Sequence, residues 1–338
     1  MRFPAVAALA LGLFAASLSL AGCRAGYATE PYVSERVMLG TKVTIRAYGD
    51  AGRAEAAVEG AFNRMRDVEK QTNNYSSRSA ISQVNDRTGG WRRTPPLIGR
   101  AIREALGGAR LSDGAYDPTL WPVWRLWGFS GEERVPRSAE LERALSLTGW
   151  RKVKMRYEAR QVFLDEGMGL DLSGMAKGMA VESAADHLAG RLRHGLVTAG
   201  STTAVFGGKP DGSPWRIGIE HPRKPGELIG IVKMKKGTMS TSGDYQTYFI
   251  RDGVRYHHIV DPKTGTPARG TMSATVVGEI DATTSDMLST GLFVMGFEKA
   301  KRFVERHPRL GIVFVTADGR VRTAGNLRGK VASLKTKI

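Results

Sequence analysis

The pattern of apolar and polar positions divides this chain into an apolar N-terminal run and a long mixed region. The uninterrupted apolar run covers residues 5–20. Residues 37–48 then alternate as a half-buried strand does, with a break at Gly40. After this strand, apolar residues return with the spacing of an amphipathic helix, at Ala54, Val58, Phe62, Met65 and Val68.

The remaining sequence predicts runs of strands with helices between them. Helical spacing occurs over residues 98–111, 138–147, 174–192, 284–295 and 297–306. Strand-like segments cover residues 153–155, 162–164, 170–172, 196–206, 215–219, 227–234, 245–250, 254–260 and 271–277, with a terminal hairpin turning at 317–319. Because helices do not alternate strictly with strands, we expect an α+β fold with largely antiparallel sheets rather than a doubly wound parallel sheet.

Charge narrows the possible partners only slightly. The 338 residues include 50 Lys and Arg against 33 Asp and Glu, a formal net charge of +17. This balance favours anionic partners such as lipid headgroups, nucleic acid or phosphorylated ligands. The basic residues are scattered and form no basic–aromatic module, so we expect no nucleic-acid partner and a basic surface close to anionic lipid.

The single cysteine, Cys23, follows Leu-Ala-Gly directly behind the apolar run. One basic residue, a short apolar stretch and small residues before a cut are typical of a secretory signal peptide. A cysteine at the cut is typical of a bacterial lipobox, and an uncleaved membrane anchor is the alternative. We expect a signal peptide over residues 1–22, lipidation of Cys23, a tether over residues 23–33 and one domain over residues 34–338. This places the protein on the periplasmic side of the bacterial cell envelope, anchored to a membrane by lipid.

The first segment with candidate chemistry runs from Asp171 to Gly178, where a predicted strand passes into a helix through Gly174. The free amides of such a helix start bind phosphate, and Lys177 adds a positive charge. The segment is neither a Walker loop nor a dinucleotide fingerprint. A glycine-bounded helix start is also common as a purely structural feature.

The second segment carries Asp286 and Thr290, four positions apart in a predicted helix. Residues at this spacing place their side chains on the same helix face. A carboxylate, a hydroxyl and a carbonyl from another segment suit Mg²⁺, which usually shares its ligands with water and substrate phosphates. The alternative is that Asp286 only caps the helix or complements its dipole.

The third segment holds His257 and His258, just before a turn that contains Pro262 and Gly265. Adjacent side chains of a strand point to opposite faces, so the two histidines cannot easily bind one metal. A histidine at such a place is also common as an ordinary surface or core residue. The sequence contains no Gly-x-Ser-x-Gly elbow, no His-Glu-x-x-His motif and no zinc cluster.

Taken in order, these segments resemble the FAD:protein FMN transferase family, the ApbE-like flavin transferases. The resemblance covers nearly all of the chain after about residue 33. The fragments that carry it are residues 37–41, 74–85, 114–119, 171–178, 210–219, 240–245, 258–265 and 286–290. Each fragment is short, but their common order is specific, and it implies a T-fold-like architecture.

The resemblance implies a magnesium-dependent enzyme that splits FAD, places FMN on a threonine or serine of an acceptor protein and releases AMP. The implied acceptors are flavin-carrying domains of membrane redox proteins. The residues implied to contact FAD are Met38, Tyr75, Ala115, Tyr116, Asp117, Asp171, Lys177, His258 and Ile259. The Gly174 carbonyl, Asp286 and Thr290 are implied to hold the metal. His258 is implied to act beside the phosphate, and Asp244 and Asp261 are lower-ranked candidates for the base.

One stretch departs from the family pattern. Where the family has a glycine pair followed by Asn or Asp, this chain has Ser201, Thr202 and Thr203. We expect the loss of an amide or carboxylate there to weaken contacts to the cofactor. This departure favours one alternative function, a non-catalytic flavin-binding lipoprotein of the periplasm. An FAD pyrophosphatase also stays open, because the use of water as acceptor needs no further residue.

Overall fold

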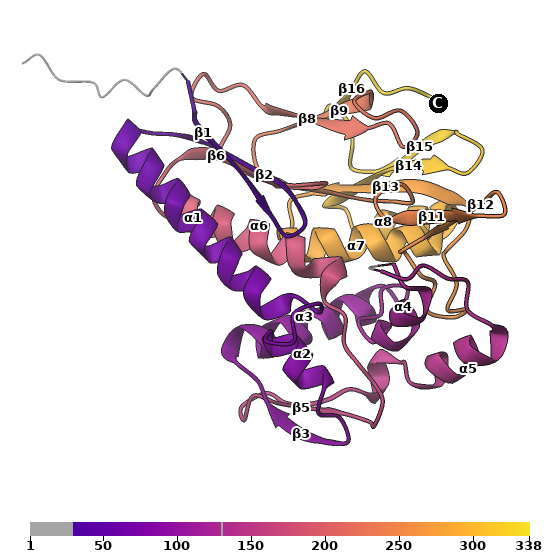
Figure 1. Cartoon of the computed structure of the whole chain (residues 1–338). Coiled ribbons are helices and arrows are strands. Elements are labelled where there is room, and N and C mark those ends of the chain that lie inside the picture. Colours follow the sequence, from indigo (N-terminus) through magenta and orange to yellow (C-terminus); the bar gives the residue numbers. More distant parts are fainter. Residues whose placement is uncertain (1–29, 130) are drawn as a thin grey trace, which may run out of the picture.

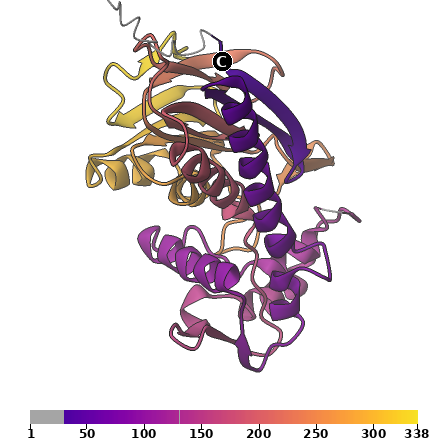
Figure 2. The same ribbon diagram turned by 90° about the vertical axis from the view of Figure 1, so that its left-hand side faces the viewer.

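The fold is built on a large antiparallel sheet that is covered on both faces (Figure 1). The computed structural model describes residues 30–129 and 131–338. The predicted signal peptide and Cys23 lie outside the described residues and stay predictions. The described part divides into a layered upper region and a smaller lower region of short helices (Figures 1 and 2).

The helices vary from one turn to six turns in length. They are α1 (Ala51–Thr72), α2 (Ala80–Asn85), α3 (Pro96–Leu111), α4 (Trp121–Trp127), α5 (Ser138–Ser146), a 3₁₀ turn (Trp150–Lys152), α6 (Ser173–Ala189), α7 (Ala282–Met295) and α8 (Phe297–Glu305).

The strands pair only in antiparallel fashion throughout the described residues. They are β1 (Tyr32–Met38), β2 (Thr41–Tyr48), β3 (Gly90–Arg93), β4 (Lys154–Arg156), β5 (Gln161–Leu164), β6 (His194–Ala199), β7 (Thr202–Phe206), β8 (Trp215–Glu220), β9 (Leu228–Met234), β10 (Gly237–Gly243), β11 (Tyr248–Arg251), β12 (Val254–His257), β13 (Thr271–Gly278), β14 (Leu310–Thr316), β15 (Val321–Gly325) and β16 (Val331–Ala332). The predicted α+β fold with largely antiparallel sheets is confirmed.

The main sheet has eight strands in the order β1-β2-β6-β7-β10-β13-β14-β15. Helices α1, α6, α7 and α8 lie on one face of this sheet, and the small sheet β16-β9-β8 lies on the other (Figure 1). Neighbouring residues of β13 therefore face different cores: Val276 packs with Phe293 of α7, whereas Val277 packs with Trp215 of β8. Covering both faces buries nearly every residue of β13 and β14.

The lower region contains α2 to α5 and the three-stranded sheet β3-β5-β4 (Figure 2). Its aromatic cluster includes the three tryptophans of α4 together with Phe249 of β11. The two-stranded β11–β12 hairpin is separate from the main sheet. The hairpin thus packs against the lower region, whereas the strands that precede and follow it in the chain, β10 and β13, belong to the main sheet of the upper region.

Two strand predictions are wrong. Residues 196–206 form two strands, β6 and β7, because Gly200 adopts a left-handed conformation (φ 55°) and turns the chain back. Residues 170–172 belong to no strand. The Asn85 side chain accepts from the Leu170 amide at 2.7 Å and donates to its carbonyl at 2.8 Å, so polar side chains replace a strand partner there.

Among the described residues, none of the helices combines the length and the apolar character that a membrane crossing requires.

Candidate functional site

The candidate site begins where helices α6 and α7 cross. A Cβ atom added to Gly178 would overlap the carbonyl oxygen of Ala282 and lie 2.7 Å from Asp286 Cβ. Real Cβ atoms do not approach other heavy atoms this closely, so only glycine allows the two helices to lie at this separation. The close approach positions the Asp286 carboxylate directly against the backbone of α6.

Asp286 is buried and held at both carboxylate oxygens. Oδ2 accepts a hydrogen bond from the Gly178 amide at 2.8 Å, and Oδ1 accepts one from Thr202 Oγ1 at 3.0 Å. In a regular helix the Gly178 amide would donate to the Gly174 carbonyl, four residues earlier. Burial raises the pKa of Asp286, whereas the Lys177 charge and these two hydrogen bonds act in the opposite direction. The carboxylate is therefore fixed in place against the Gly178 amide, one helical turn after Gly174.

Thr290 lies one helical turn after Asp286 and is close to Gly174. A Cβ on Gly174 would lie 3.8 Å from Thr290 Oγ1. The same hydroxyl forms a 3.0 Å hydrogen bond with Ser242 Oγ of β10. The three residues that the sequence analysis assigns to the metal thus meet at one crossing of α6 and α7.

This donor set fits a hard cation such as Mg²⁺. It offers a carboxylate, a hydroxyl and a main-chain carbonyl, all of them oxygen donors. Within residues 30–129 and 131–338, His, Cys, Asp and Glu form no group of three that could hold a metal ion. A single protein carboxylate is what is expected where the substrate's phosphates supply further ligands. The assignment of Mg²⁺ to these residues stays a prediction.

The start of α6 adds the Asp171 carboxylate and the Ser173 hydroxyl to the candidate site. Asp171 precedes the helix and accepts hydrogen bonds from the Ser173 amide at 2.8 Å and from Ser173 Oγ at 3.0 Å. Burial raises the pKa of Asp171, while Ser173 and Lys177 lower it. Lys177 is therefore close enough to influence both Asp171 and Asp286.

Tyr116 occupies the space between these groups. It is buried, and its hydroxyl has no hydrogen-bond partner among the described residues. Its ring approaches Gly174, where an added Cβ would lie 3.0 Å from Tyr116 Cε2. Burial raises the pKa of Tyr116 well above its usual value, helped by the charges of Asp171, Asp286 and Asp117. Buried polar groups normally have a hydrogen-bond partner, so this hydroxyl is available to a ligand or water bound at the site.

His258 faces the same groups from the segment after β12. Its Nδ1 lies 3.2 Å from the Thr247 carbonyl oxygen. Burial and then the nearby Lys177 charge lower the pKa of His258 to about 3. The imidazole is therefore neutral at pH 7; with Nδ1–H donating to Thr247, Nε2 is left as a proton acceptor.

The alternative bases are engaged elsewhere. Asp244 accepts two hydrogen bonds from the Arg223 guanidinium, both at 2.7 Å. Asp261 accepts from the Lys263 amide at 2.9 Å and shapes the turn after β12. The geometry thus favours His258 over both carboxylates, as the sequence analysis ranked them.

The other residues that the resemblance assigns to FAD lie in several different parts of the fold. Asp117 accepts hydrogen bonds from Thr119 and from the Trp150 amide, and its neighbour Ala115 is half-buried. Met38 ends β1 and is buried in the main core, whereas Ile259 is buried beneath α7. Tyr75 is 57% exposed and packs edge-on against Trp121, with ring centroids 6.0 Å apart. The flavin-binding roles of these residues stay predictions.

Comparison with known proteins identifies the family. The model of the ApbE family matches residues 39–314. The chain belongs to the ApbE family. It is 33% identical to the FAD:protein FMN transferase of Vibrio cholerae over 90% of this chain and 92% of that protein, and 29% identical to the Escherichia coli K12 enzyme of the same name over 91% and 92%.

Solved ApbE structures have the same fold. The ApbE protein of Thermotoga maritima superposes with a TM-score of 0.84 at 33% identity, covering 89% of this chain and 99% of that one. The flavin transferase ApbE of Vibrio cholerae superposes with a TM-score of 0.79 at 29% identity, again over 89% and 99%. The family and the class of enzyme predicted from the sequence are thereby confirmed.

Thr202 is the functional residue that the sequence analysis missed in this ApbE-family chain. It lies in the stretch that departs from the family pattern, yet its hydroxyl binds Asp286 directly. Ser242 lies in one of the fragments that carry the family resemblance, but the sequence analysis assigns it no role. Its hydroxyl forms a hydrogen bond with the Thr290 hydroxyl. Only the pairing of β7 with β10 brings these hydroxyls to α7, so no local signal could have found them.

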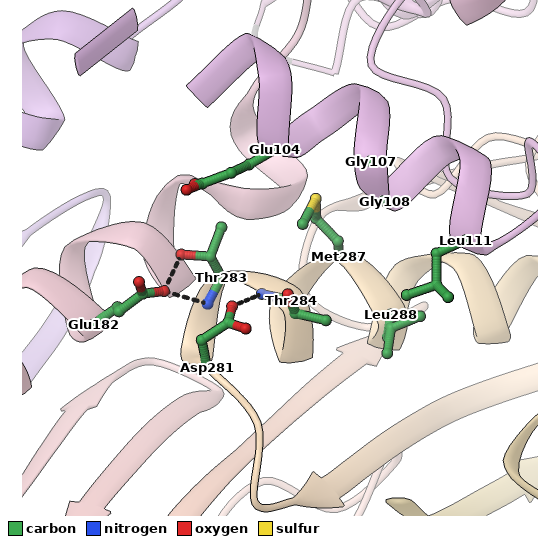
Figure 3. Close-up of a pocket in the computed structure, with 10 residues that line it drawn as sticks. All are labelled: Glu104, Gly107, Gly108, Leu111, Glu182, Asp281, Thr283, Thr284, Met287 and Leu288. Atoms are coloured by element: carbon green, nitrogen blue, oxygen red, sulfur yellow. Dashed lines mark hydrogen bonds between the residues drawn. The ribbon is translucent and has the colours of Figure 1, made fainter. Parts of the chain in front are cut away.

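The cavity in Figure 3 lies on a different side of α7 and does not suit a diphosphate. It has a volume of about 380 Å³ and is lined by α3, α6 and the start of α7. Glu104, Glu182 and Asp281 surround it (Figure 3). Among the described residues, no lysine or arginine lines this cavity to offset its carboxylates, whereas Lys177 lies beside Asp286 and His258, so the latter site is the better candidate for the flavin nucleotide.

Proposed function

We propose that this chain transfers FMN from FAD to a threonine or serine hydroxyl of an acceptor flavoprotein, with Mg²⁺ as cofactor and AMP as the second product. The observation that carries the proposal is the meeting of the Asp286 carboxylate, the Gly174 turn of α6, Lys177 and neutral His258 at one place. Membership in the ApbE family supports the same activity.

The reaction balances without any further reactant. The acceptor oxygen forms a bond to the phosphorus of the FMN half of FAD, and the bond from that phosphorus to the bridging oxygen breaks. The AMP phosphate leaves with the bridging oxygen. The proton of the acceptor hydroxyl passes to His258 Nε2, which is free to accept it because the neutral imidazole has its proton on Nδ1, facing the Thr247 carbonyl.

The chain's own residues orient the substrate and compensate its charge. Lys177 adds a positive charge to the positive end of the α6 dipole, where the diphosphate is expected to bind. Gly174, Asp286 and Thr290 would hold Mg²⁺, which supplies charge neutralisation to the phosphate oxygens. Tyr116 closes the site beneath them and offers its unpartnered hydroxyl.

Mass spectrometry of an acceptor domain tests the proposal. The mature chain is incubated with FAD, Mg²⁺ and a bacterial flavin-carrying domain that contains a Ser/Thr-Gly-Ala-Thr site. A mass gain of one FMN on the acceptor supports the transferase. Free FMN and AMP without a mass gain would instead identify an FAD pyrophosphatase, and bound but intact FAD would identify a non-catalytic flavin-binding protein.

We further propose that the enzyme acts on the periplasmic side of the cell envelope, anchored to a membrane through lipid on Cys23. The Leu-Ala-Gly-Cys sequence behind an apolar run supports this location. Membrane redox proteins with flavin-carrying domains are the acceptors that such an anchor brings within reach. Mass analysis of the N-terminal peptide from membrane fractions tests the anchor, and an unmodified Cys23 there would contradict it.

A further inference from the structure

The β11–β12 hairpin extends directly from the candidate site and leaves one strand edge unpaired. Its two-residue turn, Asp252 and Gly253, has positive φ angles of 52° and 73°, as a type I′ turn requires. One face of the hairpin carries Phe249 and Tyr256, which stack at 5.3 Å and pack against Trp127. The hairpin is therefore held rigidly against the lower region.

The register decides where the main-chain groups of β11 point. The His258 amide donates to the Thr247 carbonyl, so residues 247 and 258 form a hydrogen-bonded pair. Residues 249 and 256 are opposite each other two positions further along, as are residues 251 and 254, so they belong to the same set of hydrogen-bonded pairs. In an antiparallel pair such positions alternate with positions whose amides and carbonyls point outward. The N–H and C=O groups of Tyr248 and Ile250 thus point away from β12.

These four outward groups have no partner in the part of the chain that the structure describes. No described strand other than β12 pairs with β11. The opposite edge is different, because Arg269 donates to the Arg255 carbonyl at 2.9 Å and Ala268 donates to Ile259 at 2.9 Å. The hairpin therefore has one covered edge and one open edge.

The side chains along the open edge are exposed and form a mixed surface. Ile250 is 62% exposed and Tyr248 is 39% exposed, and both lie on the hairpin face opposite Phe249. Arg255 lies over the Tyr248 ring at 3.6 Å. A polypeptide paired with this edge would meet two apolar side chains and a positive charge.

We propose that the open edge of β11 binds an extended segment of the acceptor protein by strand addition, with the acceptor hydroxyl presented to His258. This inference rests on the proposed transferase function. Neighbouring strands lie about 4.8 Å apart, so a segment on the open edge and β12 lie on opposite sides of β11, about 10 Å apart. Thr247, just before β11, binds His258, so a segment that pairs with Tyr248 and continues past Thr247 leaves β11 behind and can turn its hydroxyl toward the catalytic base.

The chemistry of the edge defines the class of segment. Main-chain hydrogen bonds supply affinity in strand addition, and alternate side chains supply specificity. The segment should be extended, with an apolar residue facing Ile250 and an acidic residue facing Arg255. The edge offers the outward groups of only two residues, a length that suits a substrate that binds briefly and leaves.

Proline at position 250 tests the edge with little harm to the hairpin. An outward amide is the position at which an edge strand tolerates proline. Ile250→Pro removes one docking hydrogen bond and blocks the approach of a partner strand. The matched control is Thr323→Pro on β15, another edge strand, where the amide also points outward by its register with β14.

We expect Ile250→Pro to lower kcat/KM for the Ser/Thr-Gly-Ala-Thr acceptor domain at least about tenfold, with the affinity for FAD unchanged, while Thr323→Pro transfers at the wild-type rate. Equal kcat/KM for wild type and Ile250→Pro would overturn the docking proposal. If Ile250→Pro loses FAD affinity, the double variant Tyr248→Ser/Ile250→Ser decides, and we expect its KM for the acceptor to rise severalfold.

A wild-type enzyme that transfers no FMN would instead refute the proposed function. A dimer that dissociates in Ile250→Pro without any change in transfer would assign the edge to a second copy of the chain and overturn the proposal.

Discussion

Gly178→Ala tests whether the separation of α6 and α7 sets the catalytic geometry. The added methyl group would overlap the Ala282 carbonyl oxygen and lie 2.7 Å from Asp286 Cβ. Overpacking of this kind costs about 1–3 kcal/mol, and the better helix propensity of alanine returns about 1 kcal/mol. We therefore expect a net destabilisation of about 0–2 kcal/mol, together with a displacement of Asp286 away from α6.

The effect on catalysis should exceed the effect on stability. A displacement of about 1 Å at a catalytic group can lower the rate about 100-fold. The assays are urea unfolding and FMN transfer to the acceptor domain at saturating Mg²⁺.

Gly107→Ala in α3 is the control, because an added Cβ there meets nothing within 4 Å. It should stabilise the protein by about 1 kcal/mol and leave transfer unchanged. A Gly178→Ala enzyme that gains stability like the control and keeps the wild-type rate would refute the role assigned to the crossing.

Four further predictions concern individual groups of the site and one ion pair beside it. Asp286→Asn should lower transfer at least about 100-fold at any Mg²⁺ concentration, as one charge of the metal site is lost, and wild-type turnover would contradict the metal assignment. His258→Gln should slow transfer about 100-fold or more while FAD affinity, measured by fluorescence titration, stays within twofold. Because the folded pKa of His258 is about 3 and the unfolded value near 6.5, wild type should lose stability as the pH falls from 6.5 to 4, and His258→Gln should lose less in urea unfolding. Arg223→Met leaves the Asp244 carboxylate buried without its partner and should destabilise the protein by about 1–3 kcal/mol, whereas adding Asp244→Asn should restore part of the loss. Removal of Mg²⁺ with EDTA should weaken FAD binding at least about tenfold, and an unchanged FAD affinity would show that the diphosphate does not depend on a cation.

The sequence predicts most of the helices and the antiparallel character of the fold because their patterns are local. The helix α1 follows from five apolar positions, and the turn at Gly40 follows from the break in alternation. Strand β10 could not be found in this way. All seven of its residues are buried although most are Gly, Ser and Thr, so it has the composition of a loop. Its hydroxyls are satisfied only after folding, as when Thr241 binds Thr275 of β13.

The site shows the same division between local and long-range information. The spacing of Asp286 and Thr290 predicts a shared helix face, and the structure places Thr290 beside Gly174 and Asp286 beside Gly178, one turn later in α6. The hydrogen bond from Thr202 to Asp286 joins residues 84 positions apart and depends on the register of β7 in the sheet. No pattern within either segment contains that register. The stretch that departs from the family pattern thus also positions the carboxylate that is predicted to bind the metal.

The local charge of the site predicts a requirement for a cation even though the whole chain carries +17. Asp117, Asp171 and Asp286 all act on Tyr116; Lys177 acts on two of these carboxylates and Arg151 acts on Asp117. A diphosphate brought to such a place adds negative charge to a surplus of negative charge. These two cations and the positive end of the α6 dipole offset only part of that repulsion. A divalent cation bound by Asp286 would change the net charge around the diphosphate from negative to positive. The metal and the nucleotide should therefore each bind more tightly when the other is present.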